Sequence, residues 1–189
     1  MLVGPKLKDE LNFLSLNKPG LEPKKTNAGL FEKSFRRELR IEDALKTMKA
    51  IVPAGHDLYL VGYSEGAYLA PQIAIRDKRV RGIAIIGGGT RGWLKEELSN
   101  AGPRERPALK KQIRQIQKHP RSLKKWNGFS YATWYSYRGD DTLYALKKLK
   151  IPVLAVLGAR DRTIDLKTTV DDIRALMKKK KSIELKVFW

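Results

Sequence analysis

The sequence predicts an α/β fold in which strands and helices alternate around a mostly parallel sheet. The first observation is a rhythm of short apolar runs separated by longer helix-like segments, which is typical of βαβ units. The second is a glycine-flanked serine that stands directly between one apolar run and a helix-like segment. The third is size, because 189 residues with 42% hydrophobic content suffice for one domain with a substantial core. We therefore expect residues 1–189 to form a single domain.

Five apolar runs are the expected strands. The first ends at Lys18-Pro19-Gly20, a turn signal of the kind that commonly follows a strand. In chain order, the runs cover residues 11–16, 58–61, 82–86, 152–157 and, more weakly, 183–189.

Three segments between these runs are expected to be helices. Residues 41–51 place apolar side chains on one face at helical spacing, and Pro53-Ala54-Gly55 ends the pattern. Residues 64–76 follow the serine and are rich in small or apolar side chains. Residues 169–180 end in lysines, which the helix dipole favours at a C-terminus.

Residues 91–150 differ in character from the rest of the chain. Two weak helical patterns are interrupted by prolines, and we interpret the segment as a cap inserted over the sheet between two core strands. Its aromatic side chains either line a substrate pocket or pack the cap against the sheet, and the sequence favours neither. These residues are Trp126, Phe129, Tyr131, Trp134, Tyr135 and Tyr137.

The stretch LYLVGYSEGA at 58–67 contains the pattern Gly-x-Ser-x-Gly. A tight turn from strand to helix forces the serine into strained backbone geometry, and we expect Gly62 and Gly66 where side chains would collide. Ser64 is then the candidate nucleophile, and the backbone N–H of Glu65 is a candidate oxyanion donor at the helix N-terminus. The alternative is that Ser64 only caps the helix.

Nearly the whole chain resembles the α/β-hydrolase family. The segments that carry the resemblance are LNKPG at 16–20, GYSEGA at 62–67, IAIIGGG at 83–89 and KLKIPVLAVLGARDRTID at 148–165. The resemblance implies a three-layer α/β/α fold with a helical cap, present in part. It also implies a serine hydrolase (esterase, lipase or peptidase-like) that acts on an ester or other acyl bond.

The resemblance further implies an acidic partner for the serine. The family's Gly-x-x-Asp pattern falls on Gly158 to Asp161, so Asp161 would hold a histidine in the required tautomer. Asp165 is the fallback. In the alternative interpretation, Asp161 merely pairs with Arg160 or Arg162 in a surface loop.

The histidine of the family pattern has no counterpart after Asp161, and the upstream loop that gives a second oxyanion donor is also missing. The two histidines are elsewhere: His56 precedes the strand that leads to Ser64, and His119 lies in a basic, proline-bounded segment. We therefore expect a truncated serine hydrolase that is weakly active or inactive as written. The alternatives are a non-catalytic, hydrolase-like binding protein with a basic surface and, less favoured, a hydrolase completed by His119 or by a partner's histidine.

The net charge of +19 is carried mainly by residues 6–25, 36–40, 104–125 and 178–181. Such charge attracts nucleic acid or anionic membranes, or it simply solvates helix faces. Because no nucleic-acid-binding motif accompanies it, we expect no specific nucleic-acid partner. The expected partner is a small-molecule ester or acyl substrate.

The chain contains no cysteine, which excludes disulfides and thiolate chemistry, and we expect neither a cofactor nor a metal. No segment approaches the roughly 20 apolar residues that span a bilayer, and no signal peptide is recognisable. We expect a soluble, cytoplasmic product, with the reservation that an upstream targeting segment could be missing.

Overall fold

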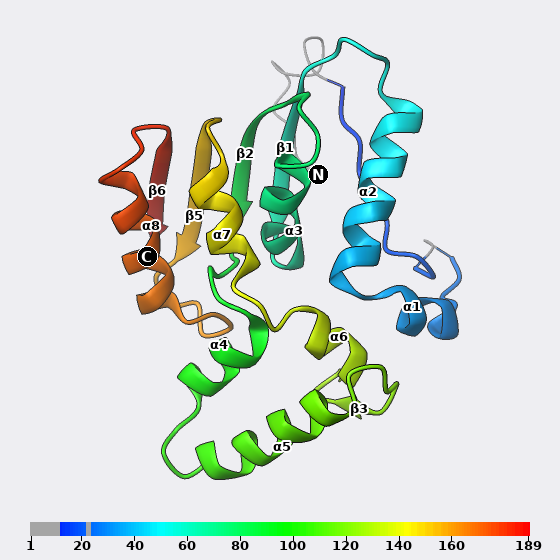
Figure 1. The fold of residues 1–189 in the computed structure, drawn as a ribbon, viewed down its shortest axis with the longest axis vertical. Coiled ribbons are helices and arrows are strands. Elements are labelled where there is room, and N and C mark those ends of the chain that lie inside the picture. Colours follow the sequence, from blue (N-terminus) through cyan, green and yellow to red (C-terminus); the bar gives the residue numbers. More distant parts are fainter. Residues whose placement is uncertain (1–11, 22–23) are drawn as a thin grey trace.

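The computed structural model describes residues 12–21 and 24–189 (Figure 1). Four parallel strands form the main sheet in the order β1-β2-β5-β6, comprising β1 (Leu58–Tyr63), β2 (Val80–Ile86), β5 (Val153–Gly158) and β6 (Ile183–Phe188). Their register places Ile83 of β2 opposite Leu60 of β1 and Val153 of β5. Helices α3 (Glu65–Ala74), α7 (Asp141–Lys148) and α8 (Leu166–Met177) make the crossovers. All four carboxyl ends therefore meet at one edge of the sheet, the edge where open α/β sheets bind ligands.

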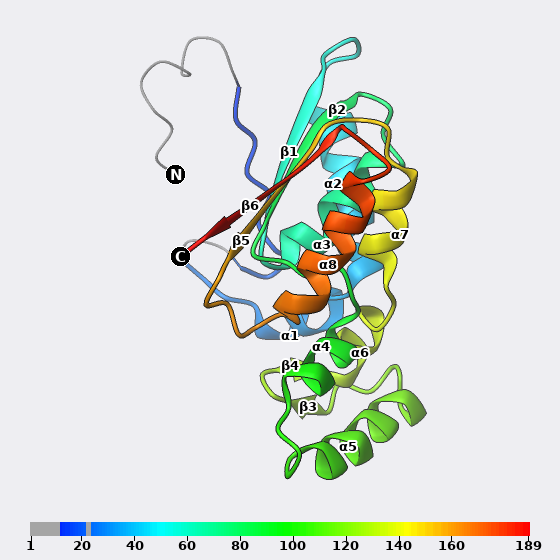
Figure 2. The same ribbon diagram turned by 90° about the vertical axis from the view of Figure 1, so that its left-hand side faces the viewer.

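Helices α3, α7 and α8, together with α2 (Arg37–Ile51), cover one face of this sheet (Figure 2). Alternate strand residues such as Ile83, Ile85 and Ala155 point into the core that these helices close. No helix of the described residues covers the other face, where Tyr59, Val61 and Tyr63 are between 68% and 74% exposed. The described chain is thus a sheet with one helical layer, a partial form of the predicted three-layer α/β/α architecture.

Four of the five predicted strands are present with small differences at their ends, and the run at 11–16 is not a strand. Residues 12–16 have no regular structure and are exposed, whereas Leu11 lies outside the described residues. An apolar run becomes a strand only when its backbone pairs with a neighbour, and no described residue pairs with β1 on the side away from β2. The prediction for this segment is therefore wrong for the residues described.

The three predicted helices are confirmed with shifted ends. Helix α2 begins at Arg37, four residues before the apolar stripe, and α3 is shorter than predicted at both ends. Helix α8 begins early because the side chain of Asp165 accepts a hydrogen bond from the Thr168 amide at 3.0 Å and so caps it. The lysines from Lys178 onward follow the helix. A further short helix, α1 (Ala28–Ser34), precedes α2.

The segment 91–150 is more helical than its sequence suggests. It contains α4 (Trp93–Asn100), α5 (Arg106–Lys118), the two-residue strands β3 (Lys125–Trp126) and β4 (Phe129–Ser130), α6 (Tyr131–Ser136) and α7. Helices α4 to α6 enclose a separate apolar cluster and lie beyond the carboxyl ends of the strands (Figure 1). Leu143 and Leu146 of α7 instead belong to the core of the sheet. We therefore propose that the cap comprises α4 to α6.

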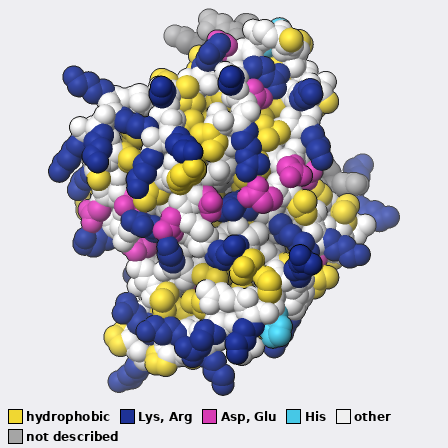
Figure 3. Space-filling view, in the orientation of Figure 1, with side chains coloured by type: hydrophobic (Ala, Val, Ile, Leu, Met, Phe, Trp, Pro, Cys, Tyr) yellow, Lys and Arg dark blue, Asp and Glu magenta, His cyan; other side chains and the backbone are white. Residues whose placement is uncertain are grey.

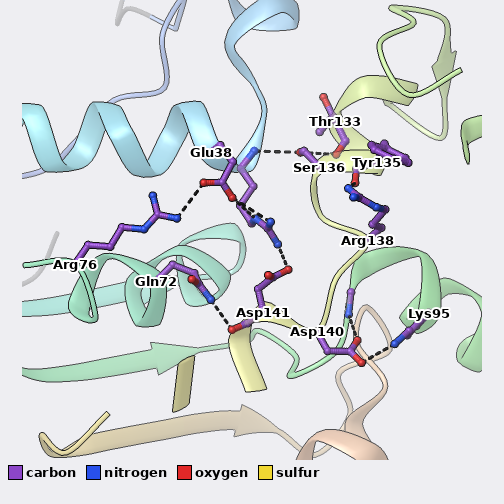
Figure 4. Close-up of polar contacts among 12 residues, drawn as sticks. Glu38, Gln72, Arg76, Lys95, Thr133, Tyr135, Ser136, Arg138, Asp140 and Asp141 are labelled. Carbon is purple, nitrogen blue, oxygen red and sulfur yellow. Dashed lines mark hydrogen bonds and ion pairs between the residues drawn. The ribbon is translucent and has the colours of Figure 1, made fainter. Parts of the chain in front are cut away.

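Two adjacent aspartates tie this cap to the helical layer (Figure 4). The Asp140 carboxylate accepts hydrogen bonds from the Gly92 amide at 3.1 Å and from Lys95 at 2.5 Å, at the start of α4. Asp141 binds Arg37 of α2 through its carboxylate and Gln72 of α3 through its backbone oxygen. The turn before α7 is thus fixed to α2, α3 and α4 at once.

No helix among the described residues is both long enough and apolar enough to cross a membrane.

Candidate active site

Ser64 lies at the tight turn between β1 and α3. Its backbone has φ 51° and ψ −114°, a conformation that side-chain-bearing residues rarely adopt, and its amide donates to the Ile86 oxygen at 2.9 Å. The side chain is exposed and makes no capping hydrogen bond to the helix. The interpretation of Ser64 as a simple helix cap therefore does not fit the structure, and its hydroxyl is available for another partner.

Close packing around the turn explains one of the two motif glycines. A Cβ on Gly62 would stand 2.2 Å from the Gly66 oxygen, so no larger residue fits there without a backbone shift. A Cβ on Gly66 would meet nothing within 4 Å among the described residues, and the expected collision at Gly66 is wrong. Gly88, in the loop after β2, also packs closely on this turn, because a Cβ there would stand 2.3 Å from the Ala67 Cβ.

Glu65, whose amide begins α3, has a buried and strongly anchored side chain. Its carboxylate lies 2.9 Å from Lys18 Nζ and 3.6 Å from Arg40 Nε, and it accepts a hydrogen bond from the Tyr137 hydroxyl at 2.5 Å. Burial, together with this carboxylate, raises the pKa of Tyr137 far above its usual range. The N-terminus of α3 is therefore tied to residues 17–20, to α2 and to the end of α6. No sequence motif points to this role, although Lys18 and Glu65 lie within the segments LNKPG and GYSEGA.

Asp161 follows β5 in a loop and is oriented by Thr163. Its Oδ1 atom accepts hydrogen bonds from the Thr163 amide at 2.8 Å and from the Thr163 hydroxyl at 2.6 Å. Its Oδ2 atom lies near Gly87, since a Cβ built on Gly87 would stand 3.9 Å from this oxygen. In the described structure no ion pair links Asp161 to Arg160 or Arg162, so the surface-pair interpretation does not hold.

Asp165, the fallback acid, is already engaged. Besides capping α8, it accepts hydrogen bonds from the hydroxyls of Ser99 and Thr168. Burial opposes the charged form, but the hydrogen bonds outweigh it and lower the pKa of Asp165. Because Asp165 does not line the pocket described next, Asp161 is the better placed of the two acids.

Ser64 and Asp161 line the same hollow, a cavity of about 460 Å³ at the carboxyl ends of the strands. Much of its wall is apolar and comes from Tyr63, Ile86, Val156, Leu157 and Phe188. None of the six aromatic residues at 126–137 lines it. Those rings pack within the cap, and Tyr137, which stacks on Trp93 with centroids 4.0 Å apart, also packs against α2 and α3. The packing interpretation of the aromatic cluster therefore fits the structure.

Neither histidine reaches this hollow. His56 lies in the exposed loop before β1, at the opposite end of that strand from Ser64. His119 is exposed at the C-terminal end of α5. The described residues also contain no group of three or more histidine or acidic side chains that could hold a metal ion.

A second buried acid lies behind the loop after β2. Glu96 is only 2% exposed and accepts a hydrogen bond from the Tyr68 hydroxyl at 2.5 Å. A Cβ on Gly89 would stand 1.7 Å from its Oε1 atom, so the glycine loop packs directly on the carboxylate. Burial raises the pKa of Glu96 to about 7. No sequence motif pointed to it.

No model of a protein family matches the sequence, and no curated protein does. Solved structures do match. A monoacylglycerol lipase of Paleococcus ferrophilus superposes with a TM-score of 0.54 and 16% identity, over 78% of this chain and 65% of the lipase. A proline iminopeptidase of Mycobacterium smegmatis gives 0.53 and 15% identity, over 82% of this chain and 64% of the peptidase.

An esterase of Pyrococcus furiosus gives a TM-score of 0.51 and 16% identity, over 79% of this chain and 51% of the esterase. The chain thus spans between 51% and 65% of the length of these three structures. All three share one arrangement of sheet and helices with this chain.

Proposed function

This chain has the α/β-hydrolase fold, and from that premise we propose that it carries the nucleophile and the acid of a serine hydrolase. The substrate class is an ester or another acyl bond. Ser64 is the nucleophile, Asp161 is the acid that orients the base, and the backbone N–H of Glu65 is an oxyanion donor. Gly62 makes the turn possible.

In the proposed reaction, the Ser64 oxygen forms a bond to the acyl carbon while its proton passes to a base. The carbonyl oxygen becomes an oxyanion, which accepts a hydrogen bond from the Glu65 amide at the N-terminus of α3. The leaving group departs with the proton from the base. A water molecule then attacks the ester on Ser64 while its proton passes to the base, the bond between the acyl carbon and the Ser64 oxygen breaks, and the base returns the proton to Ser64 as the acid leaves.

The observation that supports the proposal is that Ser64 and Asp161 both line one cavity. Ser64 has a strained backbone and a hydroxyl that makes no capping hydrogen bond to α3, and Asp161 has one oxygen fixed by Thr163. The apolar wall suits an acyl group. Serine without an adjacent base is a weak nucleophile, and neither histidine lines the cavity. We therefore infer that the chain by itself is weakly active or inactive and that a base supplied from outside restores reactivity.

The same lack of a histidine favours the second candidate, a non-catalytic, hydrolase-like binding protein. The two candidates differ in whether Ser64 reacts. A fluorophosphonate probe, which phosphonylates activated serines, is applied with and without imidazole, and the labelled peptide is identified by mass spectrometry. Labelling of Ser64 that grows with imidazole and disappears in Ser64→Ala supports the hydrolase. Absence of labelling at every imidazole concentration supports the binding protein.

A further inference from the structure

Helix α5 carries an unusual row of positive charge on the outer side of the cap. Arg106, Lys110, Arg114 and Lys118 follow one another at four-residue spacing, and Lys111 stands beside them. Residues at this spacing share one face of a helix, so the row runs along nearly the whole of α5. All five side chains are exposed. At 1.5 Å per residue, the row is about 18 Å long.

The opposite face of α5 is apolar and closes the cap. Ile116 is fully buried in the cluster with Leu94 and Trp134, and Ile113 packs against it. Gln112 donates a hydrogen bond to the Tyr131 hydroxyl at 2.9 Å on the same side. The rotation of α5 about its own axis is therefore fixed, and the charged row must face outward.

These charges are not neutralised within the described part of the chain. No carboxylate there lies within 4.0 Å of any of the five, whereas other cations are paired, such as Arg81 with Asp57 at 2.8 Å and Arg91 with Asp172 at 2.7 Å. Glu105, just before the helix, instead accepts from the Gly102 amide. Like charges four residues apart destabilise a helix, so the row opposes the stability of α5.

The row lies at one end of the molecule. In Figure 3, dark blue side chains line the lower edge of the molecule, over α5, and no acidic side chain interrupts them in this view. Leu123, five residues after Lys118 in the segment that follows the helix, is 46% exposed. A row of cations along the outward face of one helix, followed in the chain by an exposed apolar side chain, suits a flat anionic surface.

We propose that the outer face of α5 docks on an anionic phospholipid bilayer surface. The helix lies parallel to the membrane, with its cations among the lipid phosphates and Leu123 at the level of the headgroups. A single-stranded nucleic acid fits less well, because Tyr131 and Trp134 of the cap are buried and are not available to stack on bases. This surface is independent of the proposed hydrolase function and can be tested in a protein with no activity.

The test is flotation of the purified chain with vesicles of phosphatidylcholine alone or mixed with phosphatidylglycerol. The row variant carries Arg106→Gln, Lys110→Gln, Arg114→Gln and Lys118→Gln. The control variant changes the same number of exposed cations away from the cap, with Lys46→Gln, Lys78→Gln, Arg174→Gln and Lys181→Gln. Both variants lose the same charge, so a difference between them reports position. Thermal unfolding checks that each variant is folded.

We expect the wild-type chain to bind only the mixed vesicles and to release them at high salt, since exposed charges are screened. Each cation removed from the row should weaken binding about fivefold, which corresponds to about 1 kcal/mol, so the row variant loses roughly two to three orders of magnitude. The control variant should stay within about threefold of wild type, because its charges lie outside the cap and solvent ions screen their attraction to the bilayer.

Three results would overturn the proposal. Equal losses in the two variants would mean that the whole positive charge, not the row, attracts the vesicles. Equal binding of wild type to both kinds of vesicle would exclude charge recognition. Tighter binding of a DNA duplex than of mixed vesicles at the same salt, lost in the row variant, would assign the row to nucleic acid.

Discussion

The Lys18 ammonium group lies 2.9 Å from the Glu65 carboxylate and so joins the segment before α1 to the residue that follows Ser64. Arg40, itself only 8% exposed, approaches the same carboxylate from α2. A neutral side chain at position 65 would leave this buried cation without a counter-charge, which is strongly destabilising.

Glu65→Gln should therefore lower the free energy of unfolding by about 3 to 5 kcal/mol. The matched control is Glu38→Gln, which removes a carboxylate that pairs with Arg76 and Arg37 at the exposed surface. That change should cost less than about 1 kcal/mol. Urea denaturation measures both, and similar losses would show that the Glu65 cluster is not a buried anchor.

The two motif glycines should respond differently to alanine. Gly62→Ala forces a Cβ into the Gly66 carbonyl group, so we expect an insoluble or strongly destabilised protein. Gly66→Ala meets no neighbour, and it replaces a poor helix former within α3, so it should raise stability by about 0.5 to 1 kcal/mol. Thermal denaturation of the two variants checks the order. A protein that tolerates both changes equally would contradict the geometry of the turn.

Glu96 should make stability depend on pH. Its pKa is about 7 in the folded chain, because burial disfavours the charged form, and the ordinary value is 4.5. A raised pKa in the folded state contributes stability that is fully present below pH 4.5 and is lost as the pH rises through 7. At 1.4 kcal/mol per unit, the loss is about 3 kcal/mol relative to Glu96→Gln.

The measurement for Glu96 is the free energy of unfolding from pH 4.5 to 8.5 for wild type and Glu96→Gln. The difference between the two curves removes the contribution of every other titrating group. Parallel curves across this range would show that Glu96 titrates normally.

The uncovered face of the sheet should promote association. Tyr59, Val61 and Tyr63 form a row of exposed apolar side chains on β1, and β1 is an edge strand of the sheet in the part of the chain that the structure describes. Replacing Tyr59 and Val61 by threonine keeps the strand propensity and should reduce self-association in sedimentation velocity experiments. The control replaces Leu39 and Ile51 of α2 by threonine, which leaves the face unchanged. Equal effects of the two variants would rule out a specific contribution of the sheet.

The parallel sheet and three helices were predictable because their apolar periodicity reflects burial against each other. The Gly-x-Ser-x-Gly pattern located the turn at Ser64, and Gly-x-x-Asp located Asp161, since both are local in sequence. The prediction of a strand at 11–16 was wrong for the described residues 12–16, because an apolar pattern does not reveal whether a neighbouring strand is present to pair with it.

Contacts between distant segments could not be predicted in the same way. The Lys18–Glu65 pair, the anchoring of Asp141 by Arg37 and the burial of Glu96 under Gly89 all depend on how the elements pack. A lone charged residue in the sequence carries no sign of its partner. The helical content of the cap was likewise underestimated, because Pro103 and Pro120 lie outside α5 and Pro107 falls in its first turn, where proline does not interrupt a helix.

Hydrolysis of p-nitrophenyl acetate at increasing imidazole concentration most directly tests whether Ser64 is a nucleophile that lacks only a base. The rate is measured for wild type, Ser64→Ala and Asp161→Asn. Subtracting the Ser64→Ala rate at each concentration removes direct catalysis by imidazole. We predict no serine-dependent rate without imidazole, a rate that rises with imidazole in wild type, and a smaller rise in Asp161→Asn. A clear Ser64-dependent rate without imidazole, or none at any concentration, would contradict the account.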